Sequence, residues 1–134
     1  MKLIVCVDDC GGVLFNRRRV SSDRLVITDI MAYVGESRLL ASEYSMKLFP
    51  ISEKIFLLTD FSAAASDDYV FLEDLLPQCG LEQVSEVVLY HWNRLYPSDV
   101  RFPVDEIRKL GKLKSIVDFK GNSHEKITRE VYML

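Results

Sequence analysis

The run of elements in the C-terminal half of the chain restricts its fold most. Residues 87–92 are apolar, β-branched and aromatic, which favours a strand. A turn at Pro97-Ser98-Asp99 and the pair Phe102-Pro103 follow it. Residues 115–119 and 128–133 are two further strand patterns, separated by a polar turn. A strand, a long turn and two consecutive strands predict an antiparallel edge in a β-sheet.

The first half of the chain alternates strand and helix patterns. Residues 3–7 form a hydrophobic run of the kind that is buried on both faces of a sheet. Asp23 can cap a helix over residues 24–34, and Gly35 can end it. Five apolar residues keep roughly helical spacing here and form the predicted buried stripe: Leu25, Ile27, Ile30, Met31 and Val34. Further strands are expected at 38–42, 54–58 and 69–72, a helical turn at 43–49, and a helical stretch from about Glu73.

These patterns together predict an α/β fold with helices on both faces of a mixed sheet. The sheet should be parallel in its core and antiparallel at its C-terminal edge. A chain of 134 residues, 49% hydrophobic and 28% charged, fits one globular domain over residues 1–134. No apolar run approaches the length of a membrane span, so we expect no membrane partner.

Net charge and cysteine content limit the kinds of partner and cofactor that we expect. A net charge of −3 disfavours nucleic acid as a partner. The three cysteines have no metal-like spacing, which favours a reduced, cytoplasmic protein without a metal. Cys6 lies in a buried strand pattern and is expected in the core. His91 and His124 are the only histidines, and we expect them to be surface or packing residues.

The closing elements, with Asp99-x-x-Phe102-Pro103, resemble the C-terminal third of dihydrofolate reductases. Residues 3–8 and 11–16 likewise resemble the first strand and substrate loop of that family. The chain is shorter than a usual member by a strand-and-helix unit between Asp60 and Val87. Loss of an edge strand costs the least stability, because loss of an interior strand would leave the backbone hydrogen-bonding groups of its two neighbours unpaired. Residues 69–72 are therefore expected to be an interior strand.

The resemblance implies an NADPH site whose motifs are missing here. The family places a Gly-Gly pair after the interior strand and a Gly-Arg after the second strand. The matching residues are Leu72-Glu73-Asp74 and Ala41-Ser42-Glu43. Carboxylates suit a helix start but repel a pyrophosphate. We therefore expect no cofactor. The alternative is an NADPH-dependent reductase with a rebuilt cofactor site.

The resemblance also implies a carboxylate on the first helix, beside a Thr from the strand before the Phe-Pro turn. Asp23 is the nearest acid and the candidate catalytic residue, and Asp29 lies further along the same helix. Tyr90 falls where the Thr should be. Asp23 can instead be a simple N-cap. Which of the two acids faces the cleft stays open at this point.

Residues 17–19 are three consecutive arginines beside the expected substrate cleft. Guanidinium groups offer paired donors to an anionic ligand. The alternative is a solvated loop, or arginines paired with Asp8, Asp9 and Asp23, the first two of which can also form turns. The sequence thus predicts a small ligand, anionic if the arginines bind it, or a protein partner. The predicted ligand-binding residues are Asp8, Arg17, Arg18, Arg19 and Tyr90.

Overall fold

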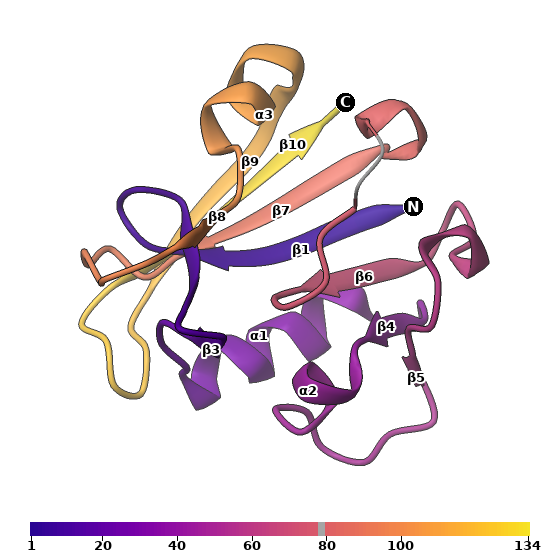
Figure 1. Cartoon of the computed structure of the whole chain (residues 1–134), viewed down its shortest axis with the longest axis horizontal. Coiled ribbons are helices and arrows are strands. Elements are labelled where there is room, and N and C mark those ends of the chain that lie inside the picture. The colour runs from indigo at the N-terminus through magenta and orange to yellow at the C-terminus, as the bar shows by residue number, and fades with distance from the viewer. Residues whose placement is uncertain (78–79) are drawn as a thin grey trace.

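The computed structural model, which describes residues 1–77 and 80–134, contains a seven-stranded sheet in the order β5-β4-β6-β1-β7-β10-β9 (Figure 1). A smaller three-stranded sheet has the order β3-β2-β8. The strands are β1 (Lys2–Val7), β2 (Gly12–Phe15), β3 (Arg18–Arg19), β4 (Leu39–Ala41), β5 (Ile55–Leu57), β6 (Tyr69–Leu72), β7 (Glu86–His91), β8 (Val100–Arg101), β9 (Lys112–Phe119) and β10 (Ile127–Met133). The helices are α1 (Arg24–Val34), α2 (Glu43–Met46) and α3 (Val104–Leu110), with single 3-10 turns η1 (Phe61–Ala63) and η2 (Leu81–Gln83).

The central strands confirm the predicted sheet. β1 runs parallel to both β6 and β7, so that Leu3 lies opposite Val70 and Val87. β10 pairs antiparallel with β7 and with β9, as the closing pattern predicts. β6 lies between β4 and β1, which confirms it as an interior strand. Its four residues are all buried because both of its faces are covered.

Helix α1 covers one face of the sheet. Asp23 caps its first turn by accepting a hydrogen bond from the Leu25 amide, and Gly35 ends it with a φ of 57°. Its buried side chains are Val26, Ile30 and Val34, which pack with Ile4, Cys6 and Tyr90. This stripe follows the spacing i, i+4, i+8, so the predicted stripe is wrong at Leu25, which is 43% exposed.

The opposite face carries α3, which the sequence patterns did not predict. Figure 1 shows α1 and α3 on opposite sides of the large sheet. Ile107 of α3 is fully buried in a core that includes Leu3, Val5 and Phe102. The small sheet of β2, β3 and β8 lies beside this core and contributes Leu14 to it. The two core layers place helices on both faces, as expected.

The helical stretch expected from Glu73 is wrong for the residues that the structure describes. The chain bends at Glu73 and Asp74 and continues without a helix to Pro77, and positions 78–79 lie outside the described residues. The side chains explain the difference: Glu73 pairs with Arg19, and Asp74 accepts a hydrogen bond from Ser42. These contacts override a weak local helix preference. No helix in the described part of the chain is long and apolar enough to cross a membrane.

Candidate functional site at the carboxyl edge of the sheet

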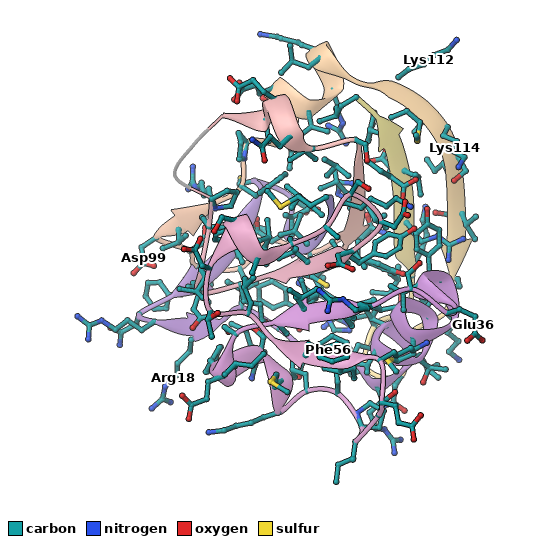
Figure 2. All side chains as sticks on the ribbon, turned by 90° about the vertical axis from the view of Figure 1, so that its right-hand side faces the viewer. Arg18, Glu36, Phe56, Asp99, Lys112 and Lys114 are labelled. Carbon is teal, nitrogen blue, oxygen red and sulfur yellow. The ribbon has the colours of Figure 1, made fainter. Side chains whose placement is uncertain are left out.

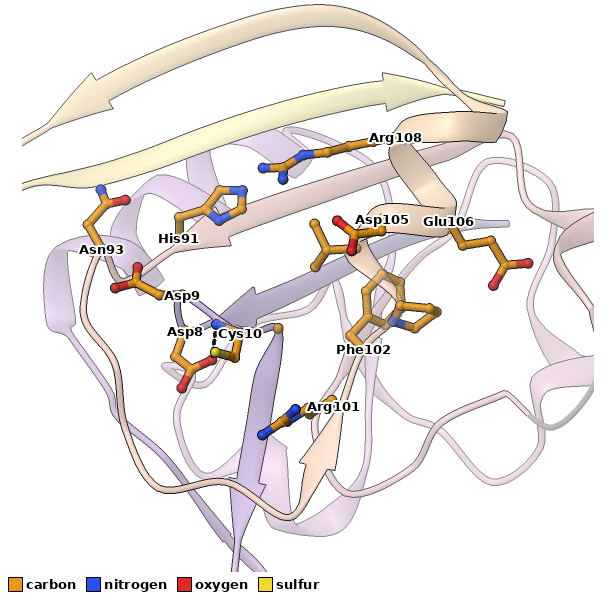
Figure 3. A pocket seen from close by; sticks show the side chains of 13 residues that line it. Asp8, Asp9, Cys10, His91, Asn93, Arg101, Phe102, Asp105, Glu106 and Arg108 are labelled. Carbon is orange, nitrogen blue, oxygen red and sulfur yellow. Dashed lines mark hydrogen bonds between the residues drawn. The ribbon is translucent and has the colours of Figure 1, made fainter.

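The carboxyl ends of β1 and β7 border a cleft of about 500 Å³, which we call the β1–β7 cleft (Figure 3). In α/β sheets, ligands bind outside the carboxyl ends of parallel strands. Figure 3 shows His91 on the cleft wall, with Asn93 and Asp9 toward one end and Arg108 and Asp105 toward the other. The charged and polar side chains that line the cleft are Asp8, Asp9, His91, Asn93, Arg101, Asp105, Glu106 and Arg108.

Asp8, a predicted ligand-binding residue, lies at the end of β1 and borders this cleft. Its carboxylate is buried and accepts hydrogen bonds from the amides of Gly12 at 2.6 Å, Cys10 at 2.8 Å and Tyr96 at 3.0 Å. These bonds hold the turn after β1 against the loop after β7. Asp8 therefore shapes the cleft as a turn former, and both of its oxygens already have backbone partners.

A buried carboxylate contacts two basic side chains of the cleft wall. Glu130 of β10 contacts His91 Nε2, and its Oε1 accepts a hydrogen bond from Arg108 at 3.2 Å. Burial raises the pKa of Glu130, but the neighbouring His91 and Arg108 outweigh burial and lower the pKa below its ordinary value. Glu130 is thus held as an anion that fixes the positions of His91 and Arg108.

The cleft offers both signs of charge. Arg101 of β8 is exposed and makes no ion pair with any residue that the structure describes. Asp9, Asp105 and Glu106 supply exposed carboxylates nearby. Among the described residues no group of three His, Cys, Asp or Glu side chains is arranged to hold a metal ion. The lining therefore presents both carboxylates and guanidinium groups to a polar ligand.

The three arginines lie on a tight hairpin between β2 and β3, where Asn16 and Arg17 have φ angles of 52° and 65°. Arg17 and Arg18 are exposed, and Figure 2 shows Arg18 projecting away from the body of the molecule. Arg19 is half-buried, and its guanidinium lies 4.2 Å from the centre of the Tyr44 ring. The three side chains therefore do not act as one cluster.

Arg19 forms a two-point ion pair with Glu73, from Nε to Oε2 at 2.9 Å and from Nη2 to Oε1 at 3.1 Å. The expected partners Asp8, Asp9 and Asp23 are not the ones it uses. Glu73 is buried and also accepts a hydrogen bond from Ser45 Oγ at 2.7 Å. This group follows β6, where the resemblance places the pyrophosphate-binding glycines. Side chains of this protein therefore occupy the position at which the resemblance implies a cofactor pyrophosphate.

Tyr90, the other predicted ligand-binding residue, is fully buried against α1. Its hydroxyl donates to Asp29 Oδ2 at 2.6 Å, and Arg129 Nη1 donates to the same oxygen at 2.6 Å. Burial, with the adjacent Asp29 carboxylate, raises the pKa of Tyr90 well above its ordinary value. Asp29 is therefore the acid that Tyr90 contacts, and neither residue lines the β1–β7 cleft.

Asp23, the candidate catalytic residue, joins the start of α1 to the loop between β9 and β10. Besides capping α1, it accepts hydrogen bonds from the amides of Asn122 and Ser123 and contacts the ring of His124. The N-cap interpretation of Asp23 therefore describes one of its contacts. The structure also brings His124 into this group, although the sequence contains no local signal that joins the two residues.

Sequence reasoning also missed the cleft residues His91, Arg101 and Arg108. The available signal was the position of His91 near the end of the strand predicted at 87–92. The carboxyl ends of neighbouring parallel strands meet at one edge of a sheet. Arg108 lies on α3, a helix that the patterns did not predict. Its place in the cleft depends on packing.

Comparison with known proteins identifies the fold. No protein-family model and no curated protein sequence matches the chain. Among solved structures, the chain is similar to dihydrofolate reductase from Enterococcus faecalis complexed with NADP(H) and RAB-propyl, with a TM-score of 0.65 and 9% identity. The match covers 98% of this chain and 94% of that one. The chain thus has a dihydrofolate-reductase-like fold, as predicted, and identity this low supports the fold alone.

Proposed function

We propose that this protein is a ligand-binding domain of the dihydrofolate-reductase-like fold that works without NADPH. Its ligand is a small polar molecule with an anionic group, bound in the β1–β7 cleft. The proposal rests above all on the Arg19–Glu73 ion pair. A buried carboxylate after β6 puts negative charge where the resemblance implies a cofactor pyrophosphate, and displacing Arg19 would leave that charge unpaired.

The β1–β7 cleft supports the binding part of the proposal. It is a large, open hollow at the edge where folds of this kind bind ligands. Arg101 is free to pair with an anion, and Arg108 is exposed beside His91. Guanidinium groups bind carboxylates and phosphates with two parallel hydrogen bonds, which gives both affinity and orientation.

Thermal unfolding of the purified full chain tests this proposal, because a ligand that binds only the native state raises the unfolding midpoint by mass action. Citrate and inorganic pyrophosphate serve as anionic probes, and NADPH and dihydrofolate serve as reductase ligands. We expect the anionic probes to raise the midpoint of the wild type. Arg101→Gln should abolish this rise, because it removes the unpaired cation of the cleft.

Arg17→Gln is the matched control, since Arg17 is an exposed arginine outside the cleft. It should respond to the anionic probes as the wild type does. Equal stabilisation of the wild type and Arg101→Gln would place anion binding elsewhere. A rise in midpoint with NADPH, accompanied by NADPH oxidation in the presence of dihydrofolate, would instead support the rebuilt reductase.

A further inference from the structure

We propose that Ser21, His124 and Asp23 form a catalytic triad that hydrolyses small esters with an anionic group, with Ser21 as the nucleophile. The three residues come from the segment before α1 and from the loop between β9 and β10. None of them lines the β1–β7 cleft, so this activity is independent of the proposed ligand site.

The distances match the order nucleophile, base and orienting acid. Ser21 Oγ lies 2.9 Å from His124 Nε2, and His124 Nδ1 lies 2.9 Å from Asp23 Oδ2. A carboxylate only accepts hydrogen bonds. His124 Nδ1 therefore carries a hydrogen and donates a hydrogen bond to Asp23. When the imidazole of His124 is neutral, its lone pair is then on Nε2, 2.9 Å from Ser21 Oγ. This is the arrangement by which a histidine activates a serine.

The base and the acid are held rigidly. The side chains of His124 and Asp23 are 2% and 0% exposed. The imidazole stacks on Trp92, with a ring-centre distance of 4.7 Å and an interplanar angle of 25°. Burial raises the pKa of Asp23, but hydrogen bonds from backbone amides and the imidazole outweigh it and hold the pKa well below its ordinary value. Asp23 therefore stays an anion that positions the ring.

The nucleophile is more accessible than its partners. Ser21 is only partly buried, whereas His124 lies beneath it. The hydroxyl of Tyr96 lies 3.1 Å from the same Nε2 atom. When Nε2 takes the serine proton, it can no longer accept from Tyr96. The Tyr96 hydroxyl is then free to donate to the oxyanion that forms on the substrate.

A hollow of about 430 Å³, which is lined by the sequence neighbour of Ser21 and by Tyr96 but not by Ser21 or His124 themselves, indicates the substrate class. Val20, which precedes Ser21, and Tyr96 both line it. Phe15 is 50% exposed and gives it an apolar wall. Arg18 also lines it and makes no ion pair with any described residue. A small ester with an apolar part and a carboxylate or phosphate would satisfy both features.

The reaction needs no reagent other than water. Ser21 Oγ attacks the ester carbonyl carbon while its proton passes to His124 Nε2. The tetrahedral intermediate collapses, the carbon–oxygen bond to the alcohol breaks, and Nε2 returns the proton to the leaving alcohol. Water then attacks the acyl-serine, again losing a proton to Nε2. The carboxylic acid leaves, and the proton returns to Ser21 Oγ.

Hydrolysis of para-nitrophenyl hydrogen succinate by the full chain tests the proposal, with para-nitrophenyl acetate as the uncharged comparison. Ser21→Ala should lower the rate at least about a hundredfold, the size of effect usual for loss of an activated group. Ser22→Ala is the control, because Ser22 is the exposed neighbour and its side chain is not among the described groups that hydrogen-bond to the His124 ring. It should hydrolyse the ester as the wild type does.

Two further variants separate chemistry from stability. Asp23→Asn can still cap α1 but loses the charge, so kcat should fall with KM unchanged. Arg18→Gln should raise KM for the succinate ester and leave the acetate ester unaffected. A fluorophosphonate probe should modify Ser21 in the folded wild type, as intact mass and peptide mapping would show.

If Ser21→Ala does not fold, the proposal is tested with Ser21→Cys instead. The thiol introduced at position 21 should react with iodoacetamide faster than the exposed Cys10 of the same chain, because His124 lowers the barrier to ionisation. Absence of fluorophosphonate labelling, unchanged hydrolysis in Ser21→Ala, or an introduced thiol that reacts no faster than Cys10 would each overturn the proposal. In that case the group serves only to hold the loop between β9 and β10.

Discussion

At the scale of single residues, neighbours of the same type have different roles. Of the three consecutive arginines, Arg18 is exposed, whereas Arg19 pairs with buried Glu73 and covers the Tyr44 ring. The hairpin geometry decides this, because successive residues of a strand point to opposite faces. A row of like charges in a sequence therefore need not be one binding surface.

We predict that Arg19→Gln lowers the free energy of unfolding by about 2–3 kcal/mol. Removing one partner of a fully buried pair costs roughly 3–5 kcal/mol, and the partial exposure of Arg19 reduces that figure. Urea-induced unfolding measures the change. Arg18→Gln is the matched control, with an expected change within about 0.5 kcal/mol. Equal effects of the two substitutions would show that the Glu73 pair contributes nothing to stability.

At the scale of elements, α3 shows how packing creates a helix. It has seven residues, too few for a stable isolated helix in water. Asp105 and Glu106 in the first turn and Arg108 and Lys109 in the last turn match its dipole. The larger contribution comes from Ile107, which is fully buried against the sheet.

Truncation of Ile107 should therefore destabilise the whole fold. We expect Ile107→Ala to lower the free energy of unfolding by about 2–5 kcal/mol, from lost transfer energy and an unfilled cavity. Leu110→Ala, on the exposed side of the same helix, should change it by less than about 0.5 kcal/mol. If chemical denaturation gives similar losses for both, α3 does not derive its stability from the core.

At the scale of the whole molecule, several carboxylates tie distant elements together and set the pH range of stability. Asp68 accepts hydrogen bonds from Arg38, which lower its pKa despite burial. The pKa values of Asp23 and Glu130 are lowered as well. Each carboxylate joins segments that are separate in the sequence.

The sign of the pH dependence follows from these lowered values. A carboxyl with a lower pKa in the folded state stabilises the protein fully above its unfolded pKa, about pH 4 to 4.5 for Asp and Glu. That contribution is lost as pH falls through the folded pKa. We expect the free energy of unfolding to fall steeply below about pH 4. Unfolding curves between about pH 6 and pH 3 measure it, and an unchanged value at the acid end would contradict the prediction.

The sequence by itself determined the strands of the large sheet and the main helix. Residues 87–92 and 69–72 were recognisable because β-branched and apolar side chains favour a buried strand at each position. The limits of α1 were recognisable because a cap such as Asp23 and a left-handed residue such as Gly35 act on adjacent backbone groups. These signals depend on residues close together in the chain, so they can be read without a structure.

Only the tertiary structure decided which side chains meet. Arg19 and Glu73 are 54 positions apart, and Asp23 and His124 are 101 positions apart. The helix expected from Glu73 is absent for the same reason. The buried carboxylate of Glu73 is stabilised by partners from distant elements, which stabilise it more than the first turn of a helix would. Such pairings depend on the placement of whole elements, which a local pattern of residues does not encode.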